Sequence, residues 1–102
     1  MKYLLQVDFP YTGPFGDDMT NAMGDLAKDI ASESGLEWKI WTENQEENTA
    51  GGIYLFDNIE DAERYLVKHT KRLESFGLSN IRGKIFNVNE PLSKLSKTTF
   101  LS

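Results

Sequence analysis

The chain has 102 residues, of which 39% are hydrophobic and 12% aromatic, and this is enough apolar material for one domain with a core. Sixteen acidic residues against eleven basic ones give a formal net charge of −5, which disfavours nucleic acid and anionic membrane surfaces as partners. The lack of cysteine excludes disulfides, thiolate metal sites and cysteine nucleophiles, and one histidine offers little to a resident metal. No apolar run suits a transmembrane helix and the first residues do not form a signal peptide, so we expect a cytoplasmic protein with no membrane partner.

The first third of the chain predicts a strand, a loop and a helix. Residues 3–9 alternate in polarity, as in a half-buried strand. The loop over 10–16 contains Gly-Pro-Phe-Gly, which fixes its backbone locally. From 19 to 31 the apolar residues step by three and four, and this spacing predicts an amphipathic helix with Asp17 or Asp18 as its N-cap.

A hairpin, a second helix and a last strand follow. Alternation predicts strands over 36–43 and 50–56, joined by a short polar turn. A Gly-Gly pair in the second of these strands indicates a β-bulge or the close approach of another backbone. Asn58 then caps a helix whose charges suit the helix dipole, and Gly77 ends it. A fourth strand is predicted over 81–88.

The element order β-α-β-β-α-β predicts an α+β, ferredoxin-like fold, in which two helices cover one face of a four-stranded antiparallel sheet. We assign residues 1–90 to this single domain. Residues 91–102 form a C-terminal tail that we expect to dock on the domain or on a partner subunit. The possible anchors of the tail are its large apolar residues, Leu92, Leu95, Phe100 and Leu101.

The predicted strands are apolar on both faces, whereas a sheet with one wet face alternates cleanly with polar residues. Trp38 and Trp41 are three positions apart on one strand and therefore point to opposite faces. Something must cover the face that the helices leave open, and a second copy of the sheet does so most simply. We therefore expect a homodimer with a large apolar interface.

The same element order also builds the RRM, an RNA-binding module, which is the main competing interpretation. An RRM stacks RNA bases on aromatic rings of its third strand. Gly51 and Ile53 stand where those rings are needed, and the first strand presents Gln6 and Asp8 on its polar side. Together with the negative net charge, this argues against RNA binding.

His69 is the one side chain whose ordinary pKa lies close to neutrality. It falls on the apolar stripe of the second predicted helix, with Tyr65 and Leu73 as neighbours one turn away. It is either a half-buried histidine that bonds a backbone carbonyl, or an acid, a base or a hydrogen-bond donor in a pocket.

Four aromatic residues are further candidates for a ligand pocket, and each has a structural alternative. Trp38 lines a pocket or packs in the core, and Trp41 forms an interface or a second pocket wall. Tyr54 contacts a ligand through its hydroxyl or is plain core. Phe15 closes a pocket mouth or, more simply, anchors its own loop.

Five separated motifs resemble, in order and spacing, the YdhR family of small bacterial proteins, to which a monooxygenase activity is ascribed. The family belongs to the dimeric α+β barrel superfamily, and the resemblance runs from the first strand into the tail. The motifs are Gly13-Pro14-Phe15-Gly16-Asp17, Trp38-Lys39-Ile40-Trp41-Thr42-Glu43, Ala50-Gly51-Gly52-Ile53-Tyr54-Leu55-Phe56, Lys68-His69-Thr70 with Arg72-Leu73, and Lys84-Ile85-Phe86 with Val88-Asn89-Glu90-Pro91-Leu92.

The resemblance implies a homodimeric α+β barrel that oxygenates a small phenolic or quinol-like aromatic with O₂ and without metal, flavin or other cofactor. An electron-rich phenolate can reduce O₂ by one electron, so the protein needs only to bind it, promote its deprotonation and exclude water. On this hypothesis His69, Trp38 and Tyr54 are catalytic, and Phe15 and Trp41 bind the substrate. The alternatives are a non-enzymatic ligand-binding or stress-associated dimer on the same fold, and a haem-handling protein with His69 as its axial ligand.

Overall fold

The computed structural model describes residues 1–98 and contains the expected order of elements followed by one short extra helix. The elements are β1 (Tyr3–Pro10), α1 (Gly16–Ala31), β2 (Leu36–Asn44), β3 (Thr49–Phe56), α2 (Ile59–Ser75), β4 (Arg82–Asn87) and α3 (Glu90–Leu95). None of the helices described within 1–98 is long and apolar enough to cross a lipid bilayer.

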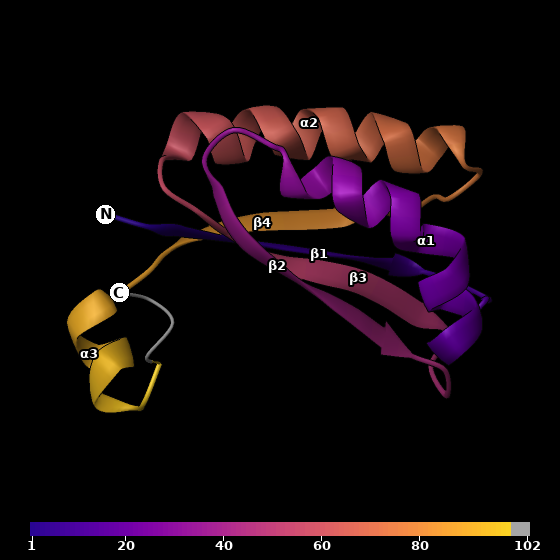
Figure 1. Ribbon diagram of the computed structural model, residues 1–102, viewed down its shortest axis with the longest axis horizontal. Helices are drawn as coiled ribbons and strands as arrows, with labels where there is room; N and C mark the ends of the chain where they lie inside the picture. Colours follow the sequence, from indigo (N-terminus) through magenta and orange to yellow (C-terminus); the bar gives the residue numbers. More distant parts are fainter. Residues whose placement is uncertain (99–102) are drawn as a thin grey trace.

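The four strands form one antiparallel sheet in the order β2-β3-β1-β4. Helices α1 and α2 lie on the same face of this sheet, and α3 lies at one end of it, on the other side (Figure 1). This arrangement confirms the predicted ferredoxin-like α+β fold.

Helix α2 begins and ends where the sequence predicts. The side chain of Asn58 accepts a hydrogen bond from the backbone N–H of Asp61 at 2.8 Å, which satisfies one of the free donors of the first turn. At the other end, Gly77 has a φ of +88°, and the N–H of Leu78 donates to the carbonyl of Leu73 at 3.1 Å. This is a Schellman-type ending, for which glycine pays no steric penalty.

Helix α1 begins differently from the prediction. Neither Asp17 nor Asp18 is its N-cap, because the helix starts at Gly16 and its cap residue, Phe15, makes no side-chain cap bond. Instead the carboxylate of Glu43, on β2, accepts from the N–H of Gly16 at 2.8 Å. The free donor is thus satisfied by a neighbouring strand, while the two aspartates occupy the first turn, where negative charge suits the helix dipole.

The core lies between the sheet and the two long helices. Burying each large side chain there is worth roughly 1.5–3 kcal/mol relative to exposure. The largest fully buried side chains of this core are Leu5, Val7, Ile30, Tyr54, Phe56 and Tyr65, whereas Leu55 is fully buried on the other face of β3.

The glycine pair of β3 marks a close approach rather than a bulge. A Cβ on Gly51 would lie 1.9 Å from the carbonyl oxygen of Val7, so any side chain there would collide with the backbone of β1. The register of β3 with both neighbours is unbroken at this point, and the sheet's irregularity lies between Leu36 and Trp38 of β2.

The face of the sheet away from α1 and α2 is only partly covered. Ile40 and Phe86 are 49% and 44% exposed there. The tail contributes α3, which was not predicted, and its residues Leu92 and Leu95 are 63% and 82% exposed. The other two expected anchors, at 100 and 101, lie outside the described residues.

Candidate functional site

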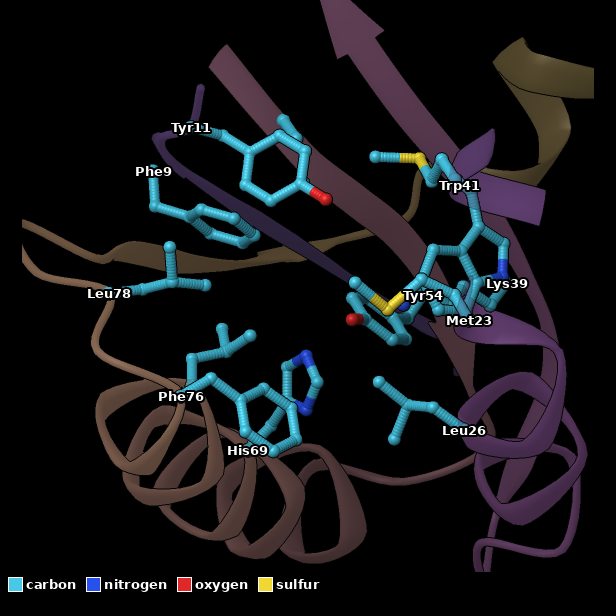
Figure 2. Close-up of a pocket in the computed structure, with 14 residues that line it drawn as sticks. Phe9, Tyr11, Met23, Leu26, Lys39, Trp41, Tyr54, His69, Phe76 and Leu78 are labelled. Atoms are coloured by element: carbon cyan, nitrogen blue, oxygen red, sulfur yellow. The ribbon is translucent and has the colours of Figure 1, made fainter. Parts of the chain in front are cut away.

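A cavity lies between α1, α2 and the helix-facing side of the sheet, with walls drawn mainly from aromatic and aliphatic side chains (Figure 2). Its volume is about 40 Å³, which is room for one or two water molecules and less than a phenolic ring needs. Its lining residues are Phe9, Tyr11, Met19, Met23, Leu26, Lys39, Trp41, Ala50, Gly51, Tyr54, His69, Leu73, Phe76 and Leu78.

A groove of about 300 Å³ between α1 and β2 is lined by some of the same side chains. Met19, Met23 and Trp41 line both the groove and the cavity. Methionine side chains are unbranched and repack easily. Met19 and Met23 therefore form a deformable part of the wall between the two spaces.

Lys39 brings a cation to the wall of this apolar cavity. Its Nζ lies 3.4 Å from the ring centroid of Trp41 and 4.8 Å from that of Tyr54. Burial, and secondarily the positive charge of Arg72, lower the pKa of Lys39 from its ordinary 10.5 to about 7. The amine therefore changes its charge near neutral pH.

Tyr11 directs a hydroxyl into the same space. The residue is 7% exposed, its hydroxyl is buried without a hydrogen-bond partner, and it points towards the middle of the cavity (Figure 2). Its backbone N–H donates to the carbonyl of Asn48 at 2.7 Å, which continues the strand pairing beyond β1 and fixes the side chain's position. Burial, helped by the charge of Glu43, raises the pKa of Tyr11, so the group stays a neutral hydrogen-bond donor.

His69 lies on α2 at the cavity wall and is 3% exposed. Its Nδ1 accepts from Arg72, at 3.3 Å from Nε and 3.0 Å from a terminal nitrogen, and Arg72 in turn donates to Asp29 of α1 at 3.0 Å. A guanidinium is always a donor, so Nδ1 must carry a lone pair and the ring's proton must sit on Nε2.

The same surroundings keep His69 neutral. Burial, followed by the charges of Lys39 and Arg72, lowers its pKa from 6.5 to about 3. His69 is thus fixed as an uncharged donor, and this arrangement opposes its use as an acid or base near neutral pH.

Tyr54 is fully buried beside His69, and its hydroxyl lies 3.4 Å from that of Tyr65, a long contact. Burial raises the pKa of Tyr54 far above its ordinary value and that of Tyr65 to about 12. Both phenols therefore remain protonated, and Tyr54 can serve as a donor but not as a base.

The two tryptophans lie on opposite faces of β2, and only Trp41 lies where a pocket residue was expected. Trp41 lines the cavity with Tyr54 and His69. Trp38 lies on the opposite face of β2, where it lines a separate hollow with Phe86 and residues next to α3. The expectation that Trp38 shares a pocket with Tyr54 and His69 is therefore corrected: alternation along β2 sends Trp38 to the open face and Lys39 and Trp41 to the helix face.

Phe15 does not line the cavity. Its ring packs edge-on against Tyr11, with centroids 5.4 Å apart, and it is partly buried against the core. The structure thus supports the simpler of its two interpretations, a loop anchor, and gives it an indirect role in holding Tyr11.

Two residues of the cavity were missed by sequence reasoning. Lys39 was given no role on its predicted strand, and Tyr11 fell in a segment interpreted as loop. The sequence carries one signal for Lys39, because alternation along the strand places it on the same face as Trp41. Within residues 1–98, no three His, Cys, Asp or Glu side chains gather as a set of metal ligands.

The fold and the cavity define a ferredoxin-like α+β protein with a small apolar site between helices and sheet. The chain belongs to the family described as "Putative mono-oxygenase ydhR", which matches residues 4–99. No curated protein matches the sequence.

Three solved structures share the fold at low sequence identity. SnoaB from Streptomyces nogalater, described as a cofactor-independent oxygenase and solved as a point mutant, aligns with a TM-score of 0.60 and 14% identity over 86% of this chain and 93% of its own. A Deinococcus radiodurans protein, described as a putative antibiotic biosynthesis monooxygenase, aligns with a TM-score of 0.62 and 9% identity over 85% of this chain and 92% of its own. The protein YJCS aligns with a TM-score of 0.61 and 15% identity over 86% of this chain and 98% of its own. These likenesses establish the fold.

Proposed function

We propose that this protein is a monooxygenase that uses O₂ to oxidise a small electron-rich phenol or quinol, without metal or flavin. The observation that carries the proposal is the cavity, an apolar chamber into which a few polar groups converge, inside a chain of a mono-oxygenase family. The description of SnoaB as a cofactor-independent oxygenase supports the same chemistry for a related fold.

The proposed reaction balances without an external reductant. The phenolate gives one electron to O₂, and the resulting radical and superoxide combine into a carbon–oxygen bond at the ring. Cleavage of the O–O bond then leaves one oxygen atom on the ring as a quinone carbonyl and releases the other as water. One hydrogen of this water comes from the oxidised ring carbon and the other from the substrate's hydroxyl. The protein's part is to bind the phenolate, hold it apart from bulk water and orient the ring.

The cavity residues suit these tasks. Trp41 and Phe9 offer ring faces and edges for an aromatic substrate. Tyr11 and the Nε2–H of His69 offer donors to a substrate oxygen. The small present volume means that Met19 and Met23 must move for the substrate to enter.

An oxygen electrode and isotope labelling test the proposal. Hydroquinones and naphthols offered to the protein with ¹⁸O₂ should give a quinone carrying one labelled oxygen, and EDTA should not slow the reaction. Tyr11→Phe should reduce turnover about tenfold or more, because the buried hydroxyl lacks any other partner. Tyr3→Phe, on β1 and outside the cavity, is the matched control.

Binding without turnover would favour the alternative, a non-enzymatic ligand-binding dimer. Haem handling is not supported by the site. The cavity of about 40 Å³ is far too small for a porphyrin, and Nδ1 of His69 is already held by Arg72. Addition of hemin should therefore give no Soret band of a histidine-ligated haem.

We further propose that the protein acts in the cytoplasm as a homodimer, joined through the open face of the sheet. Ile40, Phe86, Leu92 and Leu95 leave apolar area exposed on or beside that face, which a second sheet would cover. The tail beginning at α3 would then pack on the partner subunit.

Light scattering checks this arrangement. Phe86→Asp should give a monomer or insoluble protein, because a charge would enter the interface. Val67→Asp is the matched control, since Val67 is 58% exposed on α2, away from the sheet. A folded monomer of the unmodified chain at micromolar concentration would contradict the proposal.

A further inference from the structure

Lys39 is the least explained residue of the cavity. A cation is expensive to bury unless a charge partner compensates it. Among residues 1–98, Lys39 forms no ion pair with a carboxylate. The basic residues that do are Lys2, Arg64, Lys68, Arg72 and Arg82. Its Nζ is instead placed over the Trp41 ring at 3.4 Å, which favours a cation but does not neutralise it.

The sheet is shaped to hold this side chain in place. Lys39 pairs with Tyr54 across β2 and β3, and Trp41 pairs with Gly52. A Cβ on Gly52 would lie 2.7 Å from Cε of Lys39 and 3.2 Å from the Tyr54 ring. The lysine stem therefore crosses the space that the missing side chain of Gly52 leaves, and its amine arrives between two aromatic rings at the cavity wall (Figure 2).

We propose that Lys39 takes the proton from the substrate's hydroxyl and holds the resulting oxygen anion as an ion pair, with the Tyr11 hydroxyl as a second donor. The inference rests on the proposed function and names its ligand class: an aromatic bearing an ionisable hydroxyl. The substrate's O–H bond breaks, an N–H bond forms on Nζ, and the electron pair stays on oxygen. No oxidant or other reactant enters this step.

The neighbouring groups leave this task to Lys39. His69 cannot take it, because Arg72 donates to its Nδ1 and its Nε2 already carries the proton. Tyr54 is held protonated by burial. The amine, by contrast, has a pKa of about 7, so it can be neutral before the transfer and charged after it.

The groups that face Lys39 add positive rather than negative charge. From α2 come His69, which is neutral, and Arg72, which is positive. From β3 and the segment after β1 come the phenols Tyr54 and Tyr11. Helix α1 contributes no charged side chain to the cavity lining. Arg72 is paired with Asp29, so the amine of Lys39 and the donors of Tyr11 and His69 are the groups that an anionic ligand oxygen would meet.

Binding of 4-nitrophenol tests the proposal apart from any oxidation, since the nitro group makes the ring a poor electron donor. Its anion absorbs visible light, so the ionisation of the bound molecule is read directly. We expect wild type to lower the ionisation midpoint of the bound phenol by at least one pH unit, a tenfold or greater preference for the anion. Lys39→Met should abolish the shift, whereas Lys71→Met, on α2 and outside the cavity lining, should keep it.

4-Nitroanisole, which cannot ionise, separates the proposed role of Lys39 from the proposed oxygenase function. Lys39→Met should bind it at least as well as wild type does. If wild type binds the anisole and Lys39→Met leaves the nitrophenol shift unchanged, the role of Lys39 is wrong and the oxygenase proposal stands. If wild type binds neither molecule, both are wrong.

Two further variants guard against a folding defect. Lys39→Gln replaces Lys39→Met if circular dichroism shows the latter to be unfolded. Gly52→Ala retains the charge but displaces Cε, so it should reduce the nitrophenol shift without removing it. An undiminished shift in Gly52→Ala and in both Lys39 variants would overturn the proposal.

Discussion

The two faces of the sheet use the same four strands for opposite purposes. On the helix face, Tyr54, Phe56 and Leu5 are at most 1% exposed, and the polar groups among them are oriented towards a small cavity. On the other face, Ile40 and Phe86 are nearly half exposed, and Arg82 pairs with Asp8 at 2.8 Å.

This difference shows how one short chain divides its apolar residues. Alternation along each strand gives both faces hydrophobic side chains, but in residues 1–98 the two long helices cover only one of these faces. The closed face can therefore support buried groups with shifted pKa values, Lys39 and His69. Within residues 1–98 the open face keeps apolar side chains exposed, Ile40 and Phe86 among them.

Matched phenylalanine truncations should show the largest contrast between the faces. Phe56→Ala removes a fully buried ring from the helix face and should lower the free energy of unfolding by roughly 3–5 kcal/mol. Phe86→Ala, at a side chain 44% exposed, should cost about 1 kcal/mol or less within one subunit. Urea denaturation under conditions that dissociate any dimer measures both, and equal losses would contradict the assignment of the faces.

Removing the buried amine should stabilise the fold. The pKa of Lys39 is lowered in the folded chain, so the unfolded chain binds more protons between about pH 7 and 10.5, and stability rises with pH over that window. Below pH 7 the full penalty applies, and Lys39→Met should raise the free energy of unfolding by about 2–4 kcal/mol. Lys71→Met should change it little. A destabilised Lys39→Met at pH 6 would show that contacts within the fold offset the penalty of burying the charged amine.

His69 should make the helix face sensitive to acid. Its pKa is lowered from 6.5 to about 3, so the unfolded chain binds the extra proton over that range. Stability is therefore complete above pH 6.5 and falls by at most ~1.4 kcal/mol per pH unit below it. Urea titrations of wild type and His69→Gln from pH 7.5 to 4.5 isolate this slope as their difference. Parallel curves would mean that His69 titrates normally.

The bond from Arg72 should have the smallest of these effects. Arg72→Met removes both the donor to Nδ1 and a nearby positive charge, so the pKa of His69 should rise by about one unit while burial keeps it below 6.5. The chain has one histidine, so its NMR titration is unambiguous. Arg64→Met, at an exposed pair with Asp61, should leave the titration unchanged.

Sequence patterns predicted the fold well because its determinants are local. Asn58 and Gly77 mark the ends of α2 through contacts within a few residues, and both predictions are confirmed. The start of α1 was wrong because its free donor is satisfied by Glu43, which lies on another element. Helix α3 was missed for a different reason. It buries no residue, so its segment shows no apolar stripe from which a helix could be predicted.

The site could be predicted only in part. His69 and Tyr54 were found because a histidine and a tyrosine stand out on apolar stripes. Trp38 and Trp41 were assigned to opposite faces, but nothing in β2 says which face the helices cover, because both are apolar. The burial of Lys39 depends on Gly52, its neighbour on the adjoining strand, and such a pairing becomes visible only when the register is known.

The two tryptophans give the most direct test of the central claim, that the ligand site lies on the helix face. They supply two indole N–H signals in a nitrogen–proton NMR spectrum, one from Trp41 at the cavity and one from Trp38 on the opposite face. Titration with 4-nitrophenol should shift the Trp41 signal in a saturable manner and leave that of Trp38 in place. A saturable shift of Trp38 alone would put the site on the open face and contradict the account.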